Sequence, residues 1–187
     1  MQIVTALMGL FLLSSAVIAK PALAQAPTAP EPPSYTVTLT GYNAVPAQTK
    51  DDPFVTASGA YSNPAVVAAR SQDMAGELPF GTIVRIDEPP ATSTTCGYGM
   101  VAPIVGYRII ADTMNVRYHH RMDILFSTKA HYATAGGTKN ASTVLGVCPG
   151  ATISVVGHVD ISNIPKTQAA LVALVAGRSG DLASVAQ

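Results

Sequence analysis

Two aspartates, Asp112 and Asp123, are the residues of this sequence that are best placed to do chemistry. Asp123 stands in an apolar stretch with the composition of a strand, and a two-residue period puts it on the face of Leu125 and opposite Ile124. If that face lines a cleft, burial and a nearby like charge would raise the pKa of the Asp123 carboxyl. The carboxyl would then stay protonated and act as a general acid.

A structural interpretation of Asp123 is also open. The carboxylate can instead form an ion pair with Arg121 or Arg117 and have no catalytic role. Structural ion pairs are commoner than catalytic acids, so position alone favours the ion pair.

The other motifs of the sequence give weaker indications of chemistry. His119 and His120 are adjacent, and neighbouring residues of a strand point to opposite faces, so we expect no metal site. Ser58 lies in no nucleophile elbow, and the pair Gly136-Gly137 lacks the spacing of a phosphate loop. We therefore expect no cofactor.

The elements that must position the aspartates are short. Stretches rich in Val, Ile, Tyr and Thr recur between turn signals and have strand length: residues 35–41, 65–69, 82–86, 104–111, 122–126 and 151–159. Such strands at short spacing predict an all-β domain, either a closed barrel or a sandwich.

Helical signals are few. Ser127 can cap a short turn through Tyr132, and residues 141–145 can form another. The best helix runs over residues 165–176, with a proline in its first turn and Gly177 as its stop. It is apolar nearly all round, which fits either docking on the end of the barrel or contact with a partner or a membrane surface. We favour docking, because the polar face carries little charge.

The N-terminus reads as an export signal. Residues 1–24 hold an apolar run followed by Ala22-Leu23-Ala24, which predicts a signal peptide cleaved near Ala24 and a protein of the periplasm or outside the cell. The run is too short for a permanent membrane span. Residues 25–34 form an Ala/Pro-rich linker. Charged residues make up 12% of the chain and the formal net charge is zero, so no nucleic-acid partner is expected.

Cys96 and Cys148 make an even pair in a chain that carries an export signal. A disulfide between them is the expected state, and two buried free thiols are the alternative.

An ordered series of motifs resembles the three-aspartate (3D) domain family, named for three aspartates on a double-psi β-barrel. The series covers most of residues 35–157: Thr40-Gly41-Tyr42, Gln48-Thr49, Thr56-Ala57-Ser58-Gly59, Val67-Ala68-Ala69, Leu78-Pro79-Phe80-Gly81-Thr82, Ala111-Asp112-Thr113 and Arg121-Met122-Asp123-Ile124-Leu125-Phe126. The resemblance implies a six-stranded double-psi β-barrel with short helices over residues 35–160. A C-terminal helix and tail would follow over residues 161–187.

The family includes lytic transglycosylases that act on the bacterial cell wall. The resemblance implies that Asp123 is the general acid and base, that Asp112 is the family's second aspartate, and that Asp73 is the first, with a shift in register. This sequence reads Asp112-Thr113-Met114-Asn115 where the family has Asp-Thr-Gly-Gly. It also carries an insertion over residues 88–103.

The implied reaction is cleavage of peptidoglycan glycan strands by a monomer. Tyr42, Thr56, Ser58 and Thr82 are candidates for contacts with sugar hydroxyls, and stabilising turns or packing in the barrel is the alternative role for them. The competing function is a double-psi barrel that binds peptidoglycan or another polysaccharide without cleaving it.

Overall fold

A computed structural model describes residues 31–49, 52–90 and 94–185 of the chain, with side chains described to Gly177. The expected signal peptide lies outside the described residues, as does most of the expected linker. The described residues from Pro32 onward belong to one compact unit.

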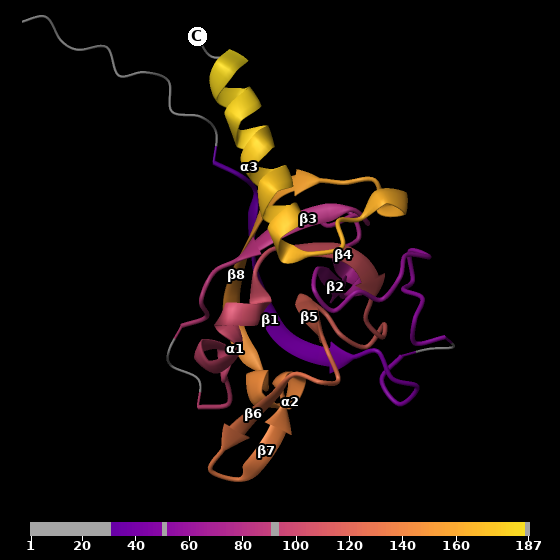
Figure 1. Ribbon diagram of the computed structural model, residues 1–187, viewed down its shortest axis with the longest axis vertical. Helices are drawn as coiled ribbons and strands as arrows, with labels where there is room; N and C mark the ends of the chain where they lie inside the picture. Colours follow the sequence, from indigo (N-terminus) through magenta and orange to yellow (C-terminus); the bar gives the residue numbers. More distant parts are fainter. Residues whose placement is uncertain (1–30, 50–51, 91–93, 186–187) are drawn as a thin grey trace, which may run out of the picture. The chain divides into compact units, whose positions relative to one another are not determined.

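Six strands close into a barrel in the order β1-β5-β2-β4-β3-β8 (Figure 1). The pairs β1/β5 and β2/β4 are parallel and the other four are antiparallel. The strands are β1 (Ser34–Asn43), β2 (Val67–Arg70), β3 (Thr82–Ile86), β4 (Arg108–Thr113), β5 (Arg121–Phe126) and β8 (Cys148–His158). Each overlaps one of the six predicted stretches, which confirms the predicted closed, mostly β architecture.

Alternation along these strands gives each of them two buried faces. Residues such as Leu39, Ala68 and Ile110 belong to one apolar cluster together with residues of α1 (Tyr98–Val105) and α2 (Ala141–Leu145); we call this the α1/α2 face. Residues of the opposite parity, such as Val67 and Ile109, belong to a second cluster that includes two residues of α3 (Gln168–Val185); we call this the α3 face.

The helix α1 corrects the predicted strand over residues 104–111, which begins only at Arg108. Ile104 and Val105 are the last residues of α1, and the buried Arg108 guanidinium donates hydrogen bonds to the carbonyls of both. Positive charge at the C-terminal carbonyls stabilises a helix end. Gly106, with a φ of 56°, follows the last residue of the helix, and this arginine binds the last carbonyls from the start of the strand.

The helix α2 has the predicted bounds, and Asn140 caps it by accepting a hydrogen bond from the Ser142 N–H. A hairpin of β6 (His131–Thr134) and β7 (Gly137–Asn140) lies beside it (Figure 1). That hairpin was not predicted, and it replaces the end of the turn expected from Ser127 to Tyr132. Two single 3₁₀ turns, Gln72–Met74 and Ile161–Asn163, complete the fold.

The helix α3 lies at the end of the barrel opposite the β6–β7 hairpin (Figure 1). It begins at Gln168, later than predicted, and Gly177 does not stop it, since the helix continues to Val185. Leu171 and Val175 are buried in the α3 face, whereas Val172 is 48% exposed. The first turns of the helix are therefore docked on the barrel, as predicted.

Cys96 and Cys148 form a disulfide, which confirms the predicted pair. None of the helices in the described parts of the chain is long and apolar enough to cross a membrane.

Candidate active site: an acidic pair beside a β-bulge

The barrel brings Asp112 and Asp123 to one face, although they come from different strands. Asp123 in β5 and Asp112 in β4 are both register partners of Ala69, from opposite sides of β2. Residues that pair directly across a sheet present their side chains to the same face. The α3 face therefore carries both carboxyls, one on each side of a small alanine side chain.

A β-bulge between β2 and β4 aligns Asp112 with its partner. Ala68 pairs with Ile110, but the next residue, Ala69, pairs with Asp112 and skips Ala111. A bulge of this kind sets two residues of one strand against one residue of the other. With regular pairing, Ala69 would face Ala111, and Asp112 would turn to the α1/α2 face.

Asp112 is half-buried and held by three donors. Its Oδ1 accepts hydrogen bonds from the backbone N–H groups of Ala57 and Thr113, both at 2.9 Å, and its Oδ2 accepts one from the Tyr42 hydroxyl at 2.9 Å. Burial, followed by the nearby Asp112, raises the pKa of Tyr42 well above its usual value. The phenol thus stays neutral and remains the donor.

Asp123 is also half-buried, and its Oδ1 accepts a hydrogen bond from the Thr40 hydroxyl. Desolvation raises the pKa of the Asp123 carboxyl, the charge of Asp112 adds to the rise, and Thr40 and Arg121 oppose it. The ion pair considered for Asp123 is not formed within the described residues. Arg121 instead lies over the Tyr118 ring, with its guanidinium carbon 5.1 Å from the ring centroid.

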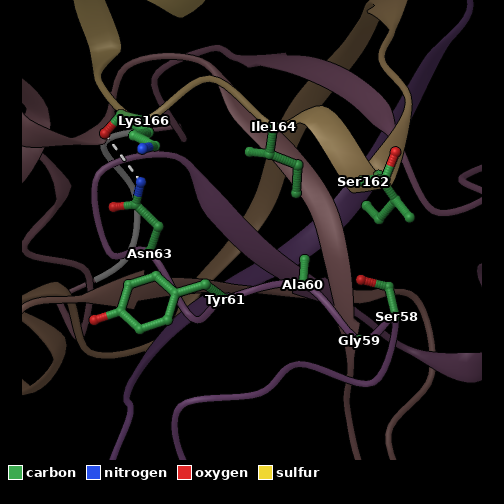
Figure 2. Close-up of a pocket in the computed structure, with 9 residues that line it drawn as sticks. Ser58, Gly59, Ala60, Tyr61, Asn63, Ser162, Ile164 and Lys166 are labelled. Carbon is green, nitrogen blue, oxygen red and sulfur yellow. Dashed lines mark hydrogen bonds between the residues drawn. The ribbon is translucent and has the colours of Figure 1, made fainter.

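The loop of residues 54–63 runs over Asp112 and leads into a hollow. The Ser58 N–H donates to the Ala111 carbonyl, which fixes the loop next to the bulge. Beyond Ser58 the loop and the segment of residues 161–166 enclose about 780 Å³ (Figure 2). The lining residues are Ser58, Gly59, Ala60, Tyr61, Asn63, Ile161, Ser162, Ile164 and Lys166. Neither aspartate of the acidic pair is among these lining residues.

The four residues predicted to contact sugar hydroxyls have different surroundings in the structure. Ser58 is half-buried and lines the hollow. Thr56 and Thr82 are buried, and their hydroxyls donate to the carbonyls of Ala60 and Pro79 within their own turns. These hydrogen bonds are of the kind expected for the alternative, turn-stabilising role. Tyr42 is buried and bound to Asp112, so it positions a carboxyl from within the barrel.

Asp73 lies among different neighbours from the pair. Its Oδ2 accepts a hydrogen bond from the His120 N–H at 2.9 Å, and imidazole nitrogens of His119 and His120 lie 3.8 and 3.7 Å from it. The Ser71 hydroxyl, with the His120 N–H, lowers the pKa of Asp73. The carboxylate fixes His120, the one non-glycine residue of the described chain with a positive φ, 48°.

Sequence reasoning missed three residues of this region. Thr40 lies two residues before Tyr42 in β1, so both side chains point to the α3 face. The alternation of side chains along β1 was therefore the signal for Thr40. Tyr61 and Lys166 line the hollow from two distant segments, and no spacing in the sequence indicates that they meet. Within the described residues no group of three histidine, cysteine or acidic side chains is arranged to hold a metal ion.

Comparisons of the chain with protein-family models, with curated proteins and with solved structures gave no match.

Proposed function

We propose that this protein cleaves the glycan strand of peptidoglycan on a double-psi β-barrel of the three-aspartate type, with Asp123 as general acid and base. The observation that carries the proposal is the acidic pair: two half-buried carboxyls on one barrel face, of which Asp123 has a pKa raised by burial. Pairs of carboxyls whose environments differ in this way divide acid and electrostatic roles.

The reaction needs only one proton-transfer group. Because Thr40 donates to Oδ1 of Asp123, the proton of the acid form belongs on Oδ2. That proton passes to the glycosidic oxygen as the bond from this oxygen to the anomeric carbon breaks. The resulting carboxylate then takes a proton from the sugar's own 6-hydroxyl, whose oxygen bonds to the anomeric carbon and gives a 1,6-anhydro product. If water attacks instead, the same steps give hydrolysis.

Asp112 has the electrostatic role in this scheme. Two backbone N–H groups and the neutral Tyr42 phenol fix its carboxylate, so it cannot turn away from the reacting sugar. A fixed negative charge stabilises positive charge that develops on the sugar ring in the transition state. It also keeps the proton on Asp123.

A cell-envelope location agrees with the proposal, since the Cys96–Cys148 disulfide is compatible with an oxidising compartment. The periplasm or the cell exterior, reached after cleavage near Ala24, remains the proposed site of action, and a monomer the proposed form.

The test is digestion of purified peptidoglycan, with the released muropeptides identified by mass spectrometry. We expect 1,6-anhydro muropeptides from the wild type and a loss of rate of about 100-fold or more in Asp123→Asn, the usual contribution of a general acid. Glu77→Gln, which changes an exposed acid, is the matched control and should keep full activity. Binding of peptidoglycan without release of any fragment would overturn cleavage and leave the wall-binding module as the function.

A further inference from the structure

The hollow beside the acidic pair has chemistry of its own. Figure 2 shows Tyr61, Asn63 and Lys166 along one side, Ser58 and Ser162 on the other, and the Ile164 side chain pointing in between them. The hollow thus combines an aromatic ring and apolar side chains with hydroxyls and one ammonium group.

Tyr61 has an open ring face. Its side chain is 67% exposed, although its backbone is fixed by an isolated β-bridge to Val55. Phe54 of the same loop is also exposed, at 58%, but Tyr61 is the aromatic residue that lines the hollow. Such a ring covers the apolar face of a flat ligand at a small cost in conformational entropy.

Charge distinguishes the two ends of the hollow. Lys166 forms no ion pair with the described residues, and its carbonyl accepts a hydrogen bond from the Asn63 amide at 3.0 Å, which holds this segment against the loop. At the other end, Asp160 accepts hydrogen bonds from the N–H and the hydroxyl of Ser162. Asp112, which accepts a hydrogen bond from the N–H of Ala57, is also near the Ser58 end. A bound anion is therefore attracted to the Lys166 end and repelled from the other.

From this arrangement we infer that the hollow binds a pyranose that carries a carboxylate, with the ring against Tyr61, the carboxylate at Lys166 and the ring hydroxyls at Ser58 and Ser162. The inference rests on the proposed function in that the sugar bound here would extend towards the acidic pair. Ser58 joins the two sites, because its loop contacts both the hollow and the bulge.

Two sources share this chemistry: a lactyl ether sugar of the cell wall whose lactyl carboxyl carries no stem peptide, and a uronic acid of another polysaccharide. The experiment uses the ¹⁵N-labelled full chain and single sugars, which have no glycosidic bond and cannot be cleaved. N-acetylmuramic acid, glucuronic acid and the neutral N-acetylglucosamine are titrated in separate arms, and amide shifts are followed by NMR. We expect at least one acidic sugar to shift the amide resonances of Tyr61, Asn63 and Ser162. The acidic sugar that binds more tightly identifies the source.

Substitutions then assign the contacts. Tyr61→Ala should weaken binding of every sugar about tenfold, since the ring face is lost, while Tyr61→Phe should bind like the parent. Lys166→Met should lower the affinity for the acidic sugar about three- to fivefold, to that of N-acetylglucosamine, as expected for an exposed ion pair. Lys166→Arg and the control Lys139→Met, an exposed lysine of the β6–β7 hairpin, should keep the preference.

Equal affinity for acidic and neutral sugars, shifts confined to other residues, or unchanged binding in Tyr61→Ala would overturn the inference. Its failure is distinct from failure of the proposed function, because a wild type that binds the acidic sugar but releases no muropeptide contradicts cleavage alone.

Discussion

The two carboxyls of the pair differ in what surrounds them. Asp112 receives three hydrogen bonds, two of them from backbone groups, whereas Asp123 receives one from Thr40 and lies beside the charge of Asp112. Hydrogen bonds to a carboxylate favour its charged form, and burial with a like charge nearby favours the neutral form. At the scale of single residues, this difference is what assigns the acid role to Asp123.

The raised pKa of Asp123 carries a stability cost that its substitution should reveal. The folded state binds this proton more tightly than the unfolded chain, where an aspartate has a pKa of about 3.9. The contribution of Asp123 to folding is then most favourable below that value, declines as the pH rises through the folded pKa, and is constant above it. Asp123→Asn should therefore unfold at higher denaturant concentration than wild type at pH 7, and the difference should vanish towards pH 4.

Urea titrations of both proteins between pH 4 and pH 8 measure this difference. Asp87→Asn serves as the control, because the Asp87 side chain is 43% exposed and its ion pair among the described residues is the surface one with Arg85. A wild type that is as stable as Asp123→Asn across the whole range would mean that the Asp123 carboxyl is not desolvated.

At the scale of elements, the alternation of side chains made the barrel strands readable, because each strand has a buried face. The same period correctly put Asp123 on the face of Leu125. It could not place Asp112, whose face depends on the bulge at Ala111, and a bulge interrupts the period on which such a prediction rests. The β6–β7 hairpin escaped prediction because its short strands are exposed and mostly polar.

The helix α3 offers an element-scale test with two adjacent residues. Leu171 is fully buried against the barrel, and Val172, next to it in the sequence, is about half exposed. Leu171→Ala should lower the free energy of unfolding by about 2–4 kcal/mol, because the buried isopropyl group of the side chain is lost and a cavity remains. Val172→Ala should change it by less than about 0.5 kcal/mol.

Chemical denaturation of the two variants provides the measurement. If both substitutions change the free energy of unfolding only slightly, the helix is not docked. Contact with a partner or a membrane surface then becomes the better account of its apolar residues. If both substitutions lower the free energy of unfolding by several kcal/mol, Val172 is also buried in the protein in solution.

At the scale of the whole molecule, the barrel is closed by strands that lie far apart in the sequence, since β1 pairs with β8. Cys148 opens β8 opposite Leu39 of β1, and Cys96 precedes α1. The disulfide therefore ties the segment that carries α1 to the strand that completes the barrel. The sequence predicted this bond from cysteine count and export alone, and it gave no information on where in the barrel the bond would lie.

Removing the disulfide should destabilise the whole unit. The two cysteines are 52 residues apart, and closing a loop of that length reduces the entropy of the unfolded chain by an amount worth about 4 kcal/mol at 25 °C. For a domain of this size that corresponds to a fall in unfolding temperature of about 10 °C.

Thermal and urea unfolding of wild type and of the double variant Cys96→Ala/Cys148→Ala, with and without reductant, measure this difference. Reductant should lower the stability of wild type to that of the double variant and leave the double variant unchanged. A thiol reagent should label unfolded wild type only after reduction. If unfolded, unreduced wild type reacts at both cysteines, the bond is absent and the barrel is held by its packing alone.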